Sequence, residues 1–310
     1  MKPGSWMPAL VLAMLLLPAG RSAFAQTTPE EFKARYDRLV SSVGVAGLGV
    51  ETLLAKWEKA FPDDPERMMA SFSFYLEKSQ TTRIDTLRQA RYLGNAPVLS
   101  LKDSLGNALN YFQVVQYDDE LFRQAIESAD AAISALPDRL DYRLYKISAL
   151  IGYEEGSPDM AKAEIKKLID YHYNSHPQWV YPGLEVDDEV FTASIQEYCV
   201  TFFKMGTPDT YEAFRELSEK ILSYQPAQTL FLTNMGSYYL VVQHEGKTAL
   251  KYYNKVLKKE PDNYTAIKNC VLLARDAKNL KLEKKYLPAL IRVTQDDAER
   301  AAAQARLEAL

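Results

Sequence analysis

The sequence predicts an all-α protein built from successive helix hairpins. Apolar residues recur at the i, i+3, i+4 spacing of one helix face, as at Phe32, Tyr36 and Leu39. Helix starts recur where a capping hydroxyl precedes proline, as at Thr28-Pro29 and Thr207-Pro208. Helix stops recur as well, and each contains a proline: Pro62, Pro137, Pro226 and Pro261.

These signals predict six hairpins in order along the chain, followed by closing helices. The expected ranges are 29–61, 65–92, 119–152, 158–205 (interrupted), 208–243 and 245–277. The last helix, residues 296–310, is Ala-rich and opens with Asp296 and Asp297. We expect it to pack around Tyr286 and Leu290 as a cap, because the open end of such an array would expose its core.

Two stretches break the helical pattern. Between residues 97 and 115 hydropathy alternates around a turn-forming segment, where Gly106 can adopt positive φ. We expect a small β-hairpin insertion near 97–115, with another helix beginning near Ser104 as the alternative. The segment from Tyr173 to Asp187 contains two prolines and a glycine and is expected to be a loop.

One interval of the sequence, residues 229–263, matches a known repeat pattern. The residues before the last proline stop match a known 34-residue pattern nearly position by position, at Leu232, Met235, Gly236, Tyr239, Ala249, Tyr253 and Pro261. Over residues 229–263 the chain resembles exported bacterial tetratricopeptide repeat (TPR) proteins. The resemblance implies a TPR-like solenoid of helix hairpins wound into a right-handed superhelix. It would be a single α-solenoid over residues 26–310, with irregular N-terminal repeats to about residue 115.

Composition places the chain among globular proteins. It has 310 residues, of which 47% are hydrophobic and 25% charged, which is too apolar for a disordered chain. Its formal net charge is −4, and it becomes −6 without residues 1–25, whose only charges are Lys2 and Arg21. This balance predicts no global attraction to nucleic acid or to an anionic membrane.

Residues 1–25 have the three parts of a secretory signal peptide. Lys2 supplies the positive start, Ala9 to Leu17 the apolar run, and Ala23-Phe24-Ala25 the cleavage site. The apolar run is far shorter than the roughly 20 residues that span a bilayer, so no membrane insertion is expected. Arg21 stands where a lipoprotein would need an acylated Cys. We therefore expect an exported protein, periplasmic or secreted, with a cleaved signal peptide and no lipid anchor.

No constellation of residues predicts an enzyme, a metal site or a cofactor. His172 and His176 have a chelating spacing, but Pro177 follows at once and no third ligand is near in sequence. Cys199 and Cys270 lie in apolar helical runs and are interpreted as small buried hydrophobes, with a disulfide as the alternative. Four pairs of acids lie where helices are expected to begin or end, which favours capping over catalysis: Asp63-Asp64, Asp118-Asp119, Asp187-Asp188 and Asp296-Asp297.

The resemblance to TPR proteins implies a concave groove lined by the first helix of each hairpin. Its outward positions would include Asn234, Ser237, Lys268, Asn269 and Arg275. Asn and basic residues hold extended peptides in peptide-binding members of the family, although the two asparagines also fit a purely structural role. We expect a non-enzymatic protein–protein interaction scaffold of the bacterial envelope. Its partner, a protein or peptide of unknown identity, would bind in this groove.

The alternative function is a glycan or small-molecule binding protein on a helical-repeat scaffold. Trp179 and Tyr181 would carry it, because aromatic rings in an exposed loop can stack on a sugar and also offer a polar group. The competing interpretation is that these two aromatics only pin the loop to the helices.

Overall fold

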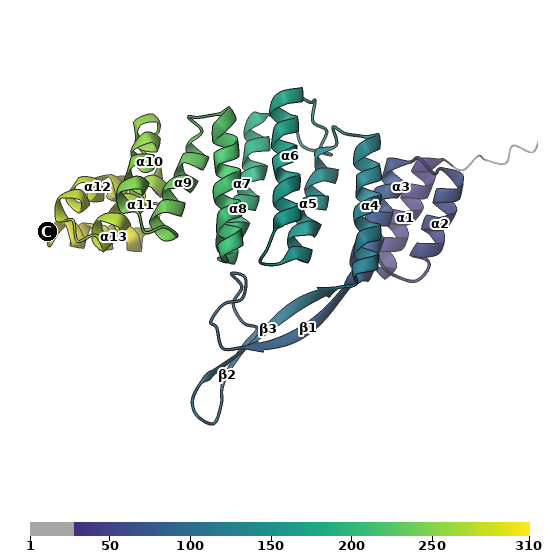
Figure 1. Ribbon diagram of the computed structural model, residues 1–310, viewed down its shortest axis with the longest axis horizontal. Helices are drawn as coiled ribbons and strands as arrows, with labels where there is room; N and C mark the ends of the chain where they lie inside the picture. Colours follow the sequence, from purple (N-terminus) through teal and green to yellow (C-terminus); the bar gives the residue numbers. More distant parts are fainter. Residues whose placement is uncertain (1–27) are drawn as a thin grey trace, which may run out of the picture.

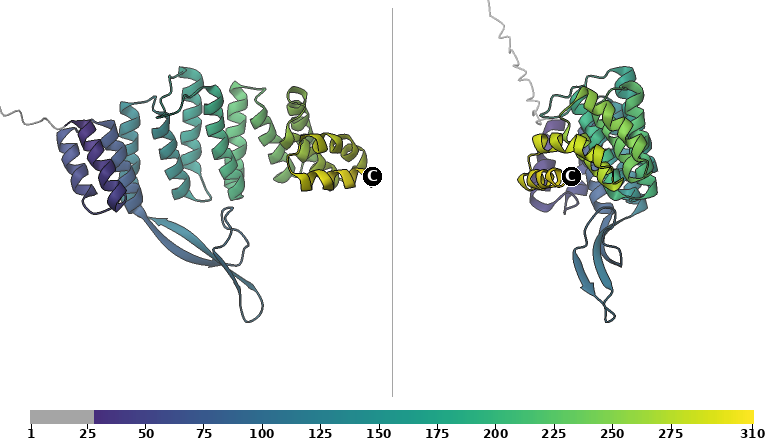
Figure 2. Two further views of the ribbon diagram at one scale, coloured as in Figure 1. Left: turned by 180° about the vertical axis from the view of Figure 1, so that it is seen from behind. Right: turned by 90° about the vertical axis from the view of Figure 1, so that its left-hand side faces the viewer.

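The computed structural model describes residues 28–310, and the expected signal peptide (1–25) lies outside the described residues. The described part contains thirteen α-helices and one small sheet of three β-strands. The helices stand side by side in an elongated row from α1 to α13, and the sheet leaves this row as an arm (Figures 1 and 2). The protein is thus mostly helical, as predicted, and fits a helical-repeat fold.

The bounds of the elements follow the predicted helix signals closely. The helices are α1 (Pro29–Val43), α2 (Val50–Ala60), α3 (Pro65–Ser79), α4 (Asp119–Ala135), α5 (Leu140–Glu154), α6 (Asp159–Ser175), α7 (Asp188–Met205), α8 (Pro208–Tyr224), α9 (Thr229–Val241), α10 (Gly246–Lys259), α11 (Tyr264–Asp276), α12 (Leu280–Val293) and α13 (Asp297–Glu308). The strands are β1 (Gln80–Leu87), β2 (Leu99–Lys102) and β3 (Ala108–Tyr117).

The proline stops explain how the helices pair. Pro62, Pro137, Pro226 and Pro261 follow α2, α4, α8 and α10, so each marks the end of an even-numbered helix. The helices can therefore be grouped as α1–α2, α3–α4 and so on to α11–α12, with α13 left over, and the two helices of every pair are in contact. The expected hairpins 119–152, 158–205, 208–243 and 245–277 are one helix out of step with this grouping.

The hairpin expected over residues 65–92 is wrong in its second half. α3 ends at Ser79, and the chain continues directly into strand β1. α3 packs instead against α4, beyond the sheet. The backbone N–H of Asp118 donates to the carbonyl of Ser79 at 2.8 Å, so the inserted segment leaves and re-enters the helical row at one point. The sheet is thus an insertion within a helix pair.

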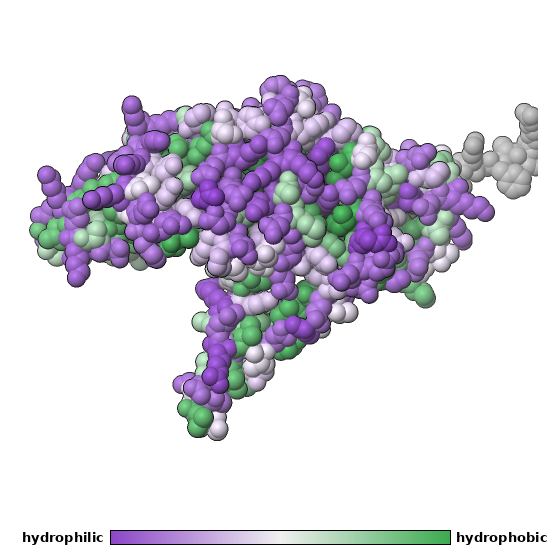
Figure 3. All heavy atoms as spheres, in the orientation of Figure 1, coloured by the Kyte–Doolittle hydropathy of each residue, from purple (hydrophilic) through white to green (hydrophobic). Residues whose placement is uncertain are grey.

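The β-hairpin expected near 97–115 is present as β2 and β3, and no helix begins near Ser104. The Asp103 carboxylate closes its turn by accepting the backbone N–H groups of Leu105 and Asn107 at 2.9 and 2.8 Å. Strand β1 is not expected from the sequence. It pairs antiparallel with the edge of β3 that β2 leaves free, which gives the strand order β1-β3-β2. Figure 3 shows apolar residues gathered on this arm, whereas the visible face of the helical row is largely hydrophilic.

The segment between β1 and β2 bends the arm back to the row (Figure 1). The Tyr92 hydroxyl donates to the Glu155 carboxylate, at the turn between α5 and α6, at 2.8 Å. Gly94 has a φ of +80° and lies so close to the turn after α7 that a Cβ there would meet the Lys204 carbonyl at 2.4 Å. The arm is therefore fixed to the row at its root and again at this bend.

The core is a chain of three hydrophobic clusters along the row. Tyr75 packs against both the first and the central cluster, and Tyr239 packs against both the central and the last. In the last cluster, Ala303 of α13 is buried together with Tyr286 and Leu290 of α12. α13 thus covers the end of the row at the position where the sequence places a cap.

Candidate functional site

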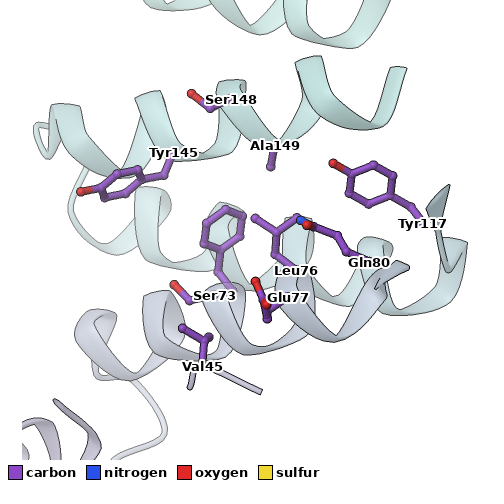
Figure 4. Close-up of a pocket in the computed structure, with 10 residues that line it drawn as sticks. Val45, Ser73, Leu76, Glu77, Gln80, Tyr117, Tyr145, Ser148 and Ala149 are labelled. Atoms are coloured by element: carbon purple, nitrogen blue, oxygen red, sulfur yellow. The ribbon is translucent and has the colours of Figure 1, made fainter. Parts of the chain in front are cut away.

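A cavity of about 400 Å³ opens between α3 and α5. Its floor is apolar, with the buried ring of Phe72 and the half-buried side chain of Leu76. Figure 4 shows the side chains of α3 and α5 facing each other across it. The polar and aromatic residues around this floor are Ser73, Glu77, Gln80, Tyr117, Tyr145 and Ser148.

Tyr145 is the most exposed aromatic side chain of this cavity, with 51% of its surface accessible. Partial desolvation, followed by the neighbouring Tyr181, raises the pKa of Tyr145, so the phenol is neutral and can donate a hydrogen bond. A large aromatic face next to an apolar floor suits the side chain of a bound ligand.

A second cavity, of about 350 Å³, lies on α7, α9 and the start of α11. Phe203 and Leu230 supply apolar surface, and Thr233 and Asn263 supply polar groups. Lys204 is the charged residue here, and its exposed ammonium pairs with none of the acids in the described chain. The cavity can therefore accept an apolar group beside an anionic one.

Both cavities open on the odd-numbered helices, and hydrogen bonds link these helices in succession. Each link joins a side chain of one odd-numbered helix to the previous odd-numbered helix. The bonded pairs are Tyr142–Glu66 (2.7 Å), Tyr198–Leu144 (2.9 Å), Asn234–Gln196 (2.7 Å) and Asn269–Ser237 (3.4 Å). We call this the odd-helix ladder, and it places the two cavities on one layer of the protein.

Three of the predicted groove residues belong to this ladder. Asn234 is buried, and its amide exchanges two hydrogen bonds with Gln196 while also donating to Ser218 at 3.2 Å. Ser237 donates to the Thr233 carbonyl at 3.0 Å and accepts from Asn269. These contacts match the structural alternative raised for the asparagines. Ser237 and Asn234 nevertheless line the second cavity.

The two basic groove residues are tied to the C-terminal helix. Lys268 pairs with Glu299 of α13 at 2.9 Å. Arg275 pairs at 2.8 Å with the buried Glu283, which is also held by Arg306 of α13. Both cations therefore fasten α13 to α11 and α12.

Trp179 is held in place by its neighbours. Its indole N–H donates to Nδ1 of His172 at 3.0 Å, and its ring lies parallel to those of His172 and Phe191. The guanidinium of Arg143 lies over the ring at 5.9 Å. Tyr181 is half-buried beside Tyr145, at the edge of the first cavity. Trp179 itself lines a separate cavity of about 340 Å³ together with Gln178 and Asp188, whereas Tyr181 lies beside Tyr145 of the first cavity.

The acid pairs and the two cysteines singled out in the sequence have structural roles. The acid pairs cap helices: Asp64, Asp118, Asp187 and Asp296 accept backbone N–H groups at the starts of α3, α4, α7 and α13. Cys199 and Cys270 are free and buried, and burial raises the pKa of each thiol to about 12. Among residues 28–310, no three His, Cys, Asp or Glu side chains converge as a metal site would require.

Sequence reasoning missed the residues of the first cavity, including Leu76, Glu77 and Tyr145. The sequence signal was the aromatic residue Tyr145, which at helical spacing shares a face of α5 with the buried Tyr142 and Ala149. That α3 and α5 share a face follows only once α3 is paired with α4. The expectation of a helix hairpin over 65–92, in place of strand β1, concealed this pairing.

Comparisons with models of protein families and with curated proteins find no match to this chain. Within the described part, no helix is both long enough and apolar enough to cross a membrane. The function of the protein is therefore inferred from the geometry of the two cavities and of the odd-numbered helices that line them.

Proposed function

We propose that the protein is a non-enzymatic, TPR-like α-solenoid that binds an extended segment of a partner protein along its odd-numbered helices. The observation that carries this proposal is the placement of both cavities on the odd-helix ladder. In the TPR family this layer is the concave side of a right-handed superhelix, which is the surface that holds peptides. The spacing of residues 229–263 supports the same assignment.

The lining of the cavities indicates what such a segment would contain. An apolar side chain fits over Phe72 and Leu76, while Ser73, Gln80 and Ser148 offer hydrogen bonds to its backbone. Glu77 lies at this cavity, whereas Lys204 lies at the other. Opposite charges at the two ends would orient the segment, with a basic group at Glu77 and an acidic group at Lys204.

The bacterial envelope is the proposed location, because residues 1–25 have the composition of a cleaved signal peptide. Fractionation of cells and a mass measurement of the purified protein test this directly. We expect the protein in the periplasm or the medium, with Gln26 as its first residue. A cytoplasmic protein that retains residues 1–25 would contradict the proposed location.

Site-specific photocrosslinking tests the binding surface. A photoreactive phenylalanine analogue replaces Tyr145 at the first cavity, or Lys167 on the outer side of α6 as a matched control. In cells, we expect position 145 to give discrete crosslinked protein bands and position 167 to give none. Equal crosslinking at both positions, or none at position 145, would contradict binding on this layer.

A glycan ligand is the second candidate, favoured by one observation. Tyr145 exposes its ring beside the hydroxyl-bearing Tyr181, and an accessible aromatic face with nearby polar groups is suited to sugars. A glycan array separates the two functions. Array binding that is lost in Tyr145→Ala, together with no protein crosslink from position 145, would favour the glycan.

A further inference from the structure

Charge is segregated along the chain, which the small net charge conceals. Residues 28–244 contain 21 basic and 32 acidic residues. Residues 245–293, which span α10 to α12, contain 12 basic and only 5 acidic residues. Residues 294–310, which include α13 at the same end of the row, add 2 basic and 4 acidic residues. This end therefore stays basic while the remainder is acidic, so a local attraction to anions can exist although the whole protein has none.

Six lysines form the centre of this basic end, and we call them the lysine patch. They are exposed, and none of them forms an ion pair with an acid in the described chain. Their spacing places them on one outer face of each helix. The patch consists of Lys251, Lys255 and Lys258 of α10 and Lys281, Lys284 and Lys285 of α12.

The lysine stripes of α10 and α12 meet on one surface. Asn254, which lies within the α10 stripe, accepts a hydrogen bond from the Tyr286 hydroxyl of α12 at 2.8 Å. The ammonium of Lys285 lies 3.2 Å from the same hydroxyl. The single acid within α10 and α12, Glu283, is occupied elsewhere, since it is buried under Arg275 and Arg306. The positive charge of the patch is therefore not neutralised within the protein.

We propose that the lysine patch docks the C-terminal end of the protein on a bilayer surface that carries anionic phospholipid headgroups. The patch lies on outer helix faces rather than around a cavity, which suits an extended surface better than a small anion. It is made of lysine, whose mobile point charge suits many headgroups and lacks the fixed fork with which arginine recognises one phosphate.

The position of the patch favours a membrane over other polyanions. α10 and α12 lie at one end of the elongated row, far from α1 (Figures 1 and 2). A flat surface can touch this end alone and leave the acidic residues 28–244 away from it. A long nucleic acid bound at the patch would extend along the acidic part and be repelled. Docking at this end also leaves the cavities of the odd-helix ladder free for a partner.

Vesicle co-sedimentation tests the proposal. The purified protein, with residues 1–25 removed, is mixed with vesicles of phosphatidylcholine alone or with about one-third phosphatidylglycerol. We expect binding only to the anionic vesicles, and release at high salt (about 0.5 M), because the attraction is electrostatic. Absence of binding to anionic vesicles at low salt would overturn the proposal.

Matched charge reversals locate the surface. Lys251→Glu with Lys284→Glu changes the patch, and Lys56→Glu with Lys59→Glu makes the same charge change on exposed residues of α2. Since each lysine near an anionic surface strengthens binding roughly fivefold, the patch variant should lose at least tenfold in partitioning. The α2 variant should keep wild-type binding. Equal losses in both variants would show a response to net charge only and would contradict the patch.

A second copy of the chain is the rival occupant, because its acidic part complements the patch. Light scattering without vesicles, at low and high salt, tests it. We expect a mass that does not change with salt. A salt-sensitive oligomer that the patch variant abolishes would assign the patch to self-association and overturn membrane docking.

Discussion

Arg306 of α13 holds the carboxylate of Glu283 of α12 with two parallel hydrogen bonds. Nε donates to Oε1 and Nη2 donates to Oε2, each at 2.9 Å, and Arg275 of α11 adds a third bond to Oε1 at 2.8 Å. Glu283 has only 1% of its surface exposed. Three helices therefore meet at one carboxylate, and the hydrogen bonds from Arg306 first, then those from Arg275, lower the pKa of Glu283 to about 2.

Replacing this carboxylate should loosen the end of the array. In Glu283→Gln the side chain keeps its shape but loses its charge and one acceptor, so neither guanidinium group keeps an anionic partner. We expect the thermal midpoint to fall by roughly 4 °C, measured by circular dichroism. Glu308→Gln, an exposed change on α13, is the control and should leave the midpoint unchanged. A Glu283→Gln midpoint equal to that of wild type would show that the carboxylate does not hold α13.

Gly236 of α9 should not tolerate a side chain. A Cβ at this position would lie 2.4 Å from the ring of Tyr253 in α10, which is fully buried and has no room to move. We expect Gly236→Ala to destabilise the protein by about 1 to 2 kcal/mol, because overpacking outweighs the gain in helix propensity. Chemical denaturation measures this difference. Gly246→Ala, whose Cβ would meet Leu273 at an ordinary 3.5 Å, is the control and should be neutral or slightly stabilising.

These helices show what the sequence could predict. Local signals, such as the capping threonine before Pro208 and the small residue at Gly236, act within one or two turns, so helix bounds and the α9–α10 crossing were readable. Strand β1 was not, because its pairing with β3 depends on residues about 30 positions away, and Ile84 and Leu87 alone fit a helix equally well. The residues of the first cavity were missed for the same reason, since α3 and α5 become neighbours only through the position of the insertion between α3 and α4.

We expect that the sheet can be removed without breaking the helix pair around it. Gln80 and Tyr117 are paired residues at the root of the arm, so Asn-Gly can join them as a two-residue hairpin turn in place of residues 81–116. Tyr117 is kept because its ring packs against Phe122 and Tyr153. We expect a cooperative melt, with more helical signal per residue and a midpoint lowered by roughly 5 °C through loss of Phe112 and other buried contacts. A variant without a cooperative transition would mean that the sheet is part of the core.

Tyr145 should matter for binding and not for folding. Because half of its surface is exposed, Tyr145→Ala should change the thermal midpoint by no more than about 1 °C. A buried aromatic anchor typically contributes most of the affinity at an interface, so crosslinking of the partner should fall at least tenfold. In this test the photoreactive group replaces Lys204 at the second cavity. A loss of crosslinking at that position in Tyr145→Ala would then show that one ligand spans both cavities. Undiminished crosslinking from position 204 would mean that the two cavities bind their ligands independently. Lys167→Ala is the control and should leave crosslinking from position 204 unchanged.

His172 should make stability depend on pH. Its Nδ1 accepts the indole N–H of Trp179, which leaves the proton on Nε2, 3.4 Å from the Asp188 carboxylate. Burial lowers the pKa of His172 below the ordinary 6.5, with Asp188 acting weakly in the opposite sense. The unfolded chain therefore binds this proton more readily, and the stability that the neutral ring provides is lost as pH falls through about 6.5.

In His172→Phe the ring stacking on Phe191 remains but the titration is gone. We expect the stability difference between wild type and His172→Phe to shrink between about pH 7.5 and pH 5.5, measured by thermal melts. A pH-independent difference would mean that the folded and unfolded states bind this proton equally, and that burial does not lower the pKa of His172.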